Sequence, residues 1–267
     1  MYRGALKQTF HKLKKLPAQI LGPKLKEKSI VWVGGVPRCG TNMLMGCYDR
    51  HPLAHVYHEA DPTTFQNYNL KPNETLRRRF FSSRASFIVC KALLDADRLP
   101  ELTTDFPHSK ILWPIRNFSD VLNSHLVRWP AFRENVDEIA TGISVDNWRG
   151  RNLSEASRDL VKSLYFPECS IADCKALFWL YRSNLYFDLA LAGKEDVLTI
   201  RYEDFTQNPQ EGCKLLADLA GLPQHPGMTK GIHSKSIRKS DPPSLHPAIL
   251  QACEEMQEKL LSHCHRF

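Results

Sequence analysis

The sequence predicts a single three-layer α/β domain, in which a parallel sheet of about five strands is flanked by helices. Two observations predict it. Short apolar runs rich in β-branched residues recur along the 267-residue chain, with helical periodicity after them. The runs are apolar throughout instead of alternating with polar residues, which is typical of parallel strands buried on both faces. We place the strands at residues 29–33, 54–57, 87–90, 110–115 and 197–200.

The helices are expected in the segments between and after these strands. Periodic apolar positions predict them at residues 41–48, 93–102, from about 119 onwards, 171–191 (a long core-packed helix) and 209–220. Right-handed crossovers bring the carboxyl ends of all the strands to one edge of the sheet, where folds of this kind bind ligands. Functional residues are therefore expected directly after the strands.

Residues 129–174 differ from the rest of the chain, because aromatic, charged and turn residues mix there without a clean period. We predict an irregular excursion over the ligand-binding edge, on the substrate side, since long loops in such domains are often functional. Its aromatic residues are candidates to shape a substrate pocket together with three aromatics of the second strand region. These residues are Trp129, Phe132, Trp148, Tyr57, Phe65 and Tyr68.

The first 28 residues form a basic N-terminal arm, ahead of a domain predicted at residues 29–267. The arm holds eight Lys/Arg against one acid, whereas the remaining residues carry 28 basic and 28 acidic side chains, so the net charge of +7 resides in the arm. A balanced body argues against nucleic acid as a partner. Apolar residues in the arm predict a weak amphipathic helix that breaks near Pro17. Two interpretations are open: the arm folds back on the domain, or it makes a peripheral contact with an anionic membrane.

No apolar run reaches the roughly 18 residues of a spanning helix, and the arm lacks the apolar stretch of a secretory signal, so we expect a cytoplasmic protein. The eight cysteines include no C-x-x-C pair. Free, buried thiols are the favoured interpretation, and a zinc site at Cys169 and Cys174 is the alternative. We expect no metal site.

The most informative segment is the glycine-containing turn after the first strand. Gly35 and Gly40 have the spacing of the nucleotide P-loop, G-x-x-x-x-G-K-[ST]. Thr41 stands where that loop has its lysine, Asn42 stands where it has its magnesium-binding hydroxyl, and the cation has moved into the loop as Arg38. Backbone amides at such a turn converge on an anion with help from the helix dipole. The pattern predicts a P-loop-like anion site that works without magnesium.

Two further segments follow strands. Arg116 comes directly after the fourth strand and Ser124 about two helical turns later, so together they can present donors to one phosphate. An ion pair between Arg116 and Asp120 is the alternative. After the fifth strand comes the sequence RYEDF, in which Tyr202 either contacts a ligand or packs at the strand end.

These three segments resemble, in order, the motifs of the sulfotransferases that use 3′-phosphoadenosine 5′-phosphosulfate (PAPS). Residues 37–42 resemble the 5′-phosphosulfate loop P-[KR]-[ST]-G-[TS]-[TS], with departures at Cys39 and Asn42. Residues 116–124 are similar to the 3′-phosphate motif R-[ND]-P-x-D-[VA]-x-x-S, with Phe118 in place of proline. Residues 201–205 resemble R-Y-E-D-L.

The resemblance implies a metal-free reaction with PAPS as the co-substrate. It places the 5′-phosphosulfate on the loop, the 3′-phosphate on Arg116 and Ser124, and the adenine on Tyr202. A late basic segment usually closes over the 3′-phosphate in this family, which implies a contribution from Arg238 or Lys239, with a solvated run of charges as the alternative. The loop residues concerned are Pro37, Arg38, Cys39, Gly40, Thr41 and Asn42.

The resemblance also implies catalytic roles. Arg38 is expected to stabilise the leaving phosphate, and Lys91 aligns with the lysine of the K-T-H segment of cytosolic members. The histidine of that segment is replaced by Leu93, so the chain is closer to the carbohydrate and bacterial members that use a Glu base. Glu59, after the second strand, is the expected general base. His58 and Asp61 are the alternatives.

Two other functions stay open on the sequence. A small-molecule P-loop kinase would bind magnesium-ATP, and a catalytically weak protein would only hold PAPS or its product adenosine 3′,5′-bisphosphate. The acceptor is a small molecule, a lipid or a carbohydrate, and the sequence does not choose between them. It also leaves the oligomeric state open.

Overall fold

The computed structural model describes residues 14–235 and 237–267. Its centre is a five-stranded sheet in the order β2-β5-β1-β6-β7, and all the paired strands run parallel. The predicted fold class is confirmed, and the observed strands match the predicted ones to within one residue. They are β1 (Ser29–Val33), β2 (Ala54–Tyr57), β5 (Phe87–Lys91), β6 (Lys110–Ile115) and β7 (Val197–Arg201). A small antiparallel pair, β3 (Phe65–Gln66) and β4 (Asn69–Leu70), lies outside this sheet.

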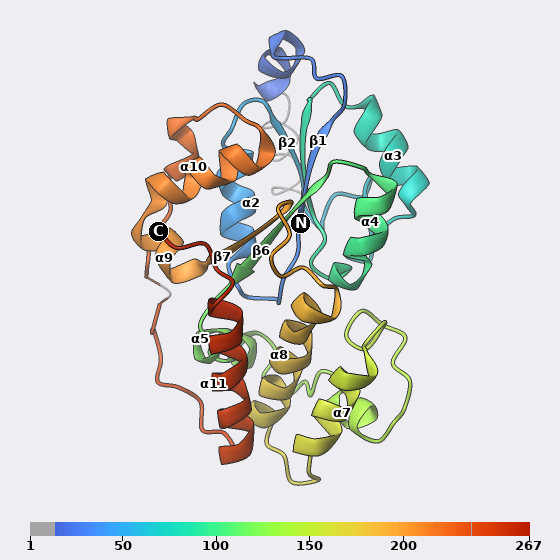
Figure 1. Cartoon of the computed structure of the whole chain (residues 1–267), viewed down its shortest axis with the longest axis vertical. Helices are drawn as coiled ribbons and strands as arrows, with labels where there is room; N and C mark the ends of the chain where they lie inside the picture. Colours follow the sequence, from blue (N-terminus) through green and yellow to red (C-terminus); the bar gives the residue numbers. More distant parts are fainter. Residues whose placement is uncertain (1–13, 236) are drawn as a thin grey trace.

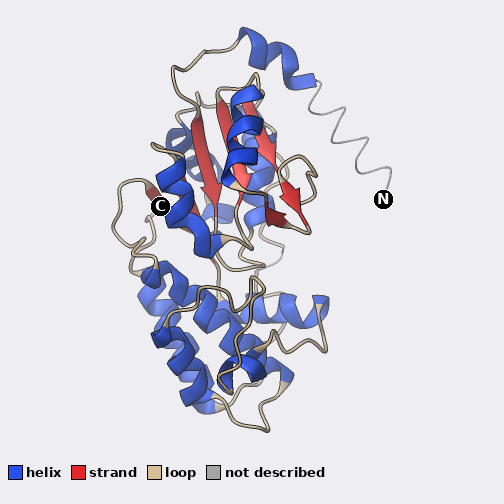
Figure 2. Ribbon diagram, turned by 90° about the vertical axis from the view of Figure 1, so that its right-hand side faces the viewer, coloured by secondary structure: helices blue, strands red, loops and turns tan. Residues whose placement is uncertain are grey.

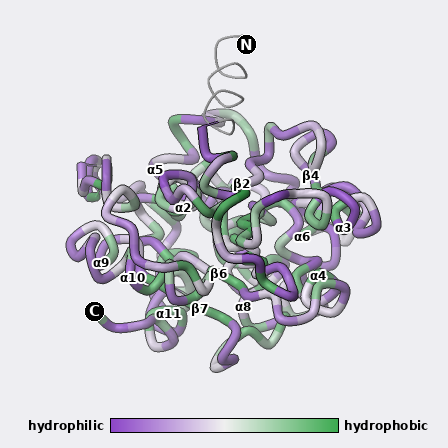
Figure 3. The backbone as a smooth tube through the Cα atoms, turned by 90° about the horizontal axis from the view of Figure 1, so that it is seen from above, coloured by the Kyte–Doolittle hydropathy of each residue, from purple (hydrophilic) through white to green (hydrophobic). Residues whose placement is uncertain are grey.

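Both faces of the sheet are buried, which explains why the strands are apolar throughout. Successive side chains of a strand point to opposite faces. In β1, Ile30 and Trp32 accordingly belong to one core cluster, whereas Val31 and Val33 belong to a second cluster across the sheet. In Figure 3 the hydrophilic stretches of the chain lie mostly along the outer loops and helices.

Helices cover each face of the sheet. On one side lie α2 (Thr41–Asp49) and α10 (Pro209–Ala220), and on the other lie α3 (Asn73–Ser82) and α4 (Leu99–Asp105) (Figure 1). Short helical turns connect these parts: η1 (Ala96–Arg98), α9 (Tyr202–Gln207) and η2 (Pro226–Thr229). The C-terminal segment returns beside β7, where the amide of His265 donates to the carbonyl of Thr199 at 2.8 Å.

A second layer of helices lies beyond the carboxyl ends of the strands, and we call it the helical lobe (Figures 1 and 2). Its members are α5 (Phe118–Arg128), α6 (Val136–Ala140), α7 (Glu155–Leu164), α8 (Ile171–Asp188) and α11 (Pro247–Leu261). The central helix is α8, which contacts each of the others. A capping box between Ser170 and Asp173 starts it.

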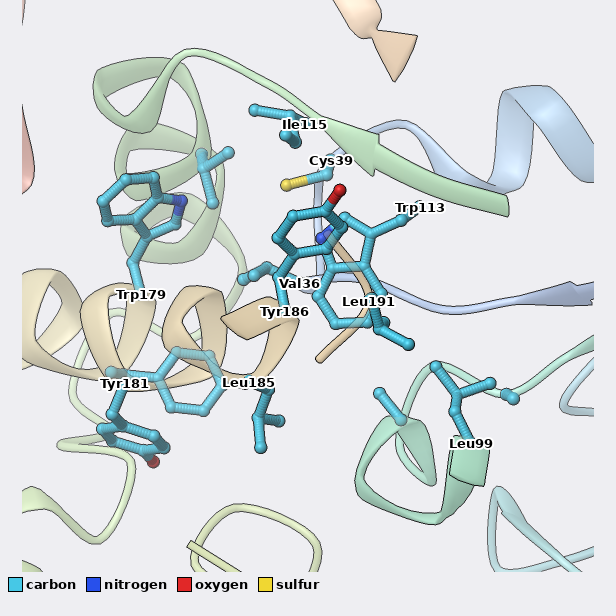
Figure 4. Close-up of a cluster of buried hydrophobic side chains, with 14 of the residues drawn as sticks. Val36, Cys39, Leu99, Trp113, Ile115, Trp179, Tyr181, Leu185, Tyr186 and Leu191 are labelled. Carbon is cyan, nitrogen blue, oxygen red and sulfur yellow. The ribbon is translucent and has the colours of Figure 1, made fainter. Parts of the chain in front are cut away.

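Aromatic side chains join the lobe to the sheet. Trp113 of β6 packs against Tyr186 of α8, with ring centroids 5.7 Å apart. Figure 4 shows this cluster, in which Cys39 and Ile115 lie beside the two rings. Residues from the loop after β1, from β6 and from α8 therefore share one core, which fixes the lobe against the ligand-binding edge.

Three expectations about secondary structure were wrong in part. Residues 129–174 are not irregular, because they include α6, α7 and the start of α8. Because α7 has only ten residues, its helical state depends on packing against α8. Residues 93–95 precede the helical turns instead of starting a helix, and the Asp95 carboxylate accepts from the amide of Leu70 at 2.7 Å. The sequence analysis did not predict α3 or α11.

The described part of the arm folds back on the domain. Residues 14–21 are helical, and Pro17 lies inside this helix, so the predicted break there was wrong. Lys15 donates to the Asp49 carboxylate at 3.0 Å and to the Ala54 carbonyl at 3.1 Å, and Gln19 also donates to that carbonyl. The apolar residues Leu6, Phe10 and Leu13 of the predicted arm helix lie outside the described residues. Within the described ranges, no helix has both the length and the apolar character needed to cross a membrane.

Candidate active site

A cavity of about 1050 Å³ lies at the carboxyl ends of the strands, against the helical lobe. Ten of the twelve predicted site residues line it, and Cys39 and Tyr202 do not. The lining residues from the predicted site are Pro37, Arg38, Gly40, Thr41, Asn42, Glu59, Lys91, Arg116, Ser124 and Lys239. The cavity is thus formed by segments that lie far apart in the sequence, and most of them lie at or just after the end of a strand.

The loop between β1 and α2, which we call the anion loop, presents backbone donors to the cavity. Gly40 is the N-cap of α2 with φ of 92°, and no side chain caps this helix. Among the described residues, no acceptor is found for the amides of Gly40, Thr41 and Asn42. The first turn of α2 also holds no acidic residue. Free amides at the positive end of a nine-residue helix form a site for an anion.

Two of the sequence motifs meet at Arg38. Its Nε donates to the Ser124 hydroxyl at 2.7 Å, and its carbonyl accepts from Nη1 of Arg116 at 3.3 Å. Arg38 has φ of 75°, a left-handed conformation that is costly for a residue with a side chain. Burial chiefly, with the nearby cations Arg116 and Arg128, lowers the pKa of Arg38. An anion bound among these guanidinium groups would relieve their repulsion.

Arg116 is held on two sides. Its Nη2 lies 3.5 Å from the Asp120 carboxylate, and its guanidinium carbon lies 4.7 Å from the centre of the Tyr202 ring. The Arg116–Asp120 ion pair, which was the alternative interpretation of this motif, is therefore present. Arg116 and Asp120 nevertheless both line the cavity, so the pair does not withdraw Arg116 from a ligand.

The late basic segment is bound to α5. The amide of Arg238 donates to both oxygens of Asp120 at 3.0 and 3.1 Å, and the Asn123 side chain donates to the Asp241 carbonyl at 2.9 Å. These contacts hold Lys239 and Ser240 at the cavity wall.

Lys91 connects the anion loop to the predicted base. Its Nζ donates to the Glu59 carboxylate at 2.6 Å and to Oδ1 of Asn42 at 2.9 Å. Lys91 is 4% exposed, whereas 21% of the Glu59 side chain is exposed. The two alternative bases do not line the cavity, and Asp61 accepts from the amide and the hydroxyl of Thr63 in a local turn.

Cys39 and Tyr202 lie behind the site. The Cys39 thiol is buried in the core of Figure 4, and burial raises its pKa to about 12. Tyr202 is buried between Arg116 and Gly40, and a Cβ at Gly40 would overlap its ring. Both residues therefore pack against the anion loop, and neither lines this cavity.

The sequence analysis missed several lining residues. Arg128 lies one helical turn after Ser124 on α5, and this i+4 spacing could have identified it. Arg149 gave no such signal, because its position depends on contacts within the helical lobe. The other unpredicted lining residues are Leu94, Asp120, Asn123, Val127 and Ser240.

The lining is strongly cationic, with six Lys/Arg side chains against two carboxylates, which favours an anionic ligand. All eight cysteines are free, and seven of them are buried, as the favoured interpretation of the thiols predicted. Residues 14–235 and 237–267 contain no cluster of three or more His, Cys, Asp or Glu side chains that would hold a metal ion.

Comparison with known proteins identifies the fold. No family model and no curated protein sequence match the chain. Among solved structures, the sulfotransferase domain of the olefin synthase of Synechococcus PCC 7002 is similar, with a TM-score of 0.53 at 10% identity over 90% of this chain and 97% of that one. The sulfotransferase domain of the curacin biosynthetic pathway gives a TM-score of 0.52 at 14% identity over 87% and 98%. The chain has the fold of these domains, and its activity is argued from its own site.

Proposed function

We propose that this protein transfers a sulfonate group from PAPS to a hydroxyl or amine of an acceptor. The observation that carries the proposal is the junction of two cationic segments in one cavity, where Arg38 of the anion loop contacts Ser124 of the Arg116 segment. PAPS has two separate anionic ends, the 5′-phosphosulfate and the 3′-phosphate. A loop rich in free amides suits the first, and the Arg116 guanidinium with Ser124 and Lys239 suits the second.

In-line transfer requires the acceptor oxygen to attack sulfur while the bond from sulfur to the 5′-phosphate oxygen breaks. Glu59 takes the proton of the acceptor hydroxyl. Lys91 fixes Glu59 against the anion loop through its bonds to Glu59 and Asn42. Arg38 stabilises the charge that develops on the departing phosphate, a role typically worth about 2.7–4 kcal/mol of barrier. This assignment makes the protein a member of the group that uses a Glu base.

The anion loop also argues against the kinase alternative. Thr41 and Asn42 stand where ATP-binding loops have a phosphate-binding lysine and a magnesium-binding hydroxyl. A site without those two groups is poorly equipped to neutralise a magnesium triphosphate.

Calorimetry with three nucleotides tests the proposal. We expect adenosine 3′,5′-bisphosphate to bind, adenosine 5′-monophosphate to bind at least tenfold more weakly because it lacks the 3′-phosphate, and magnesium-ATP not to compete. Arg116→Gln should remove most of the difference between the first two ligands. Strong binding of magnesium-ATP together with no binding of the bisphosphate would reject the proposal.

A transfer assay separates an enzyme from a binding protein. Release of the bisphosphate from PAPS is followed with a pooled metabolite extract, and products heavier by one SO₃ group are sought by mass spectrometry. Tight binding of the bisphosphate without any such product from an extract or from defined acceptors would favour the catalytically weak binding protein.

A further inference from the structure

Two cations of the cavity, Arg128 and Arg149, have no role in the donor site or in the transfer step proposed above. Arg149 is held in the helical lobe, where its Nε donates to the Glu134 carboxylate at 2.7 Å. Its guanidinium carbon lies 4.5 Å from the ring centre of Phe132 and 4.6 Å from that of Trp148. Among the described residues, no second hydrogen bond is found for this side chain, so the remaining N–H groups of Arg149 are available to a ligand.

The charge of Arg149 is not needed to neutralise Glu134. The Nζ of Lys175, which is fully buried, lies 2.6 Å from the other oxygen of the Glu134 carboxylate. His125 also faces this group, with its Nδ1 4.0 Å from Glu134, but burial lowers the pKa of His125 to about 4, so it is neutral near pH 7. One carboxylate thus meets two cations, and the surplus positive charge is on Arg149, the member of the cluster that lines the cavity.

Arg128 supplies a second surplus charge. It lines the cavity from the last turn of α5 and forms no ion pair with any acid in the described part of the chain. It lies close enough to Arg38 to contribute to the lowered pKa of that residue. Arg128 therefore stands beside the place where the sulfonate would be transferred.

We infer that Arg128 and Arg149 bind an anionic group of the acceptor itself: a carboxylate, a sulfate or a phosphate on a ring-containing body. The inference rests on the proposed function and names its substrate class. Guanidinium groups recognise such oxyanions through paired N–H donors. The indoles of Trp129 and Trp148 line the same part of the cavity and offer flat apolar surfaces to a ring. A neutral lipid or alcohol would leave the remaining N–H groups of Arg149 and the guanidinium of Arg128 without an oxyanion to bind.

Matched acceptors test this class. Two pairs differ only in that a carboxylate replaces a hydrogen: benzyl alcohol with 4-(hydroxymethyl)benzoate, and methyl β-xyloside with methyl β-glucuronide. The pairs separate an aromatic from a sugar body. In each case the product is measured by mass spectrometry, and binding to protein saturated with adenosine 3′,5′-bisphosphate is measured by calorimetry. We expect the anionic member of at least one pair to be preferred about tenfold or more, in kcat/KM or in affinity.

Variants locate the preference. Arg149→Gln should lower kcat/KM or affinity for the anionic member about tenfold or more and change the neutral member less than twofold. Arg128→Gln gives the same test at an exposed residue without an ion pair, in case loss of Arg149 disturbs the buried Glu134 cluster. Lys162→Gln is the matched control, because Lys162 is a cation of the same lobe that does not line the cavity.

The outcomes separate this inference from the proposed function. If the wild-type protein does not bind the bisphosphate, both fall. If it binds the bisphosphate but treats charged and neutral acceptors alike, or binds none of the anionic members, only the acceptor class is overturned. The same holds if Arg149→Gln and Arg128→Gln weaken binding of the bisphosphate as much as binding of the acceptor, since the two arginines would then belong to the donor site.

Discussion

The anion loop and the helical lobe each present an arginine to the same cavity, but they hold it by different means. Arg38 is placed by the backbone conformation of a short turn between β1 and α2 and by a neighbour on α5. Arg149 is placed by Glu134, which in turn depends on Lys175, 41 residues further along the chain. The backbone conformation of the loop is therefore set within a short segment, whereas the lobe side depends on buried ion pairs. This difference predicts that the two sides fail in different ways when they are altered.

The largest effect is expected at Glu59, the proposed base, which Lys91 connects to the anion loop. Glu59→Gln keeps an acceptor for Lys91 but removes the base, so the transfer rate should fall about 10²–10⁴-fold. Affinity for adenosine 3′,5′-bisphosphate, measured by calorimetry, should change little. A variant that retains most of the wild-type rate would show that another group takes the proton.

Changes in the helical lobe should chiefly lower the stability of the protein. Lys175→Met leaves the buried Glu134 carboxylate without its fully buried partner, and we expect a loss of about 3–5 kcal/mol in the free energy of unfolding, measured by denaturant titration. The double change with Glu134→Gln should recover part of this loss. If the loss in the double variant equals the sum of the losses in the two single variants, the ion pair does not stabilise the lobe.

Changes in the anion loop should chiefly lower the rate of transfer. Arg38→Gln keeps a side chain at the left-handed position but removes the cation, so kcat should fall by a factor that corresponds to about 2.7–4 kcal/mol. The free energy of unfolding should stay close to that of the wild-type protein. If Arg38→Gln lowers the free energy of unfolding as much as Lys175→Met does, the loop and the lobe do not differ in this respect.

A smaller effect is expected from the backbone of the loop. Gly40→Ala forces a Cβ against the Tyr202 ring at a left-handed φ of 92°, which should cost roughly 1–3 kcal/mol and weaken bisphosphate binding. Gly142→Ala is the matched control, because its φ is 85° but nothing lies within 4 Å of the added Cβ. Equal losses at the two glycines would mean that only backbone strain matters.

The mildest test uses pH and a residue that contacts both regions. His125 hydrogen-bonds the Pro37 carbonyl of the anion loop and faces Glu134 of the lobe, and burial lowers its pKa to about 4. Its unfolded pKa is about 6.5, so between these values the unfolded state binds the proton and the folded state does not. The stability contributed by neutral His125 is therefore lost as pH falls from about 6.5 towards 4. In His125→Asn, the free energy of unfolding that is lost between pH 6.5 and 4 should be smaller by about 1–3 kcal/mol.

The sequence by itself determined the fold class and the side of the cavity formed by the anion loop and the Arg116 segment. Continuous apolar runs predict the five buried strands. The anion loop and Arg116 directly follow strands, and Ser124 lies about two helical turns after Arg116, so local spacing is enough to place them. Cys39 and Tyr202 belong to the same motifs but lie behind the loop, because the side on which a residue points is set by packing and not by its place in a motif.

Only the tertiary structure decided the helical lobe and the side of the cavity that the lobe lines. Residues 129–174 lack a clean period, and their helices form against α8 through contacts that the chain makes only once it is folded. Arg149 enters the cavity because a buried carboxylate, a buried lysine and two aromatic rings hold it there. Such a placement depends on long-range electrostatics in a desolvated interior, and no local pattern in the amino-acid sequence encodes it.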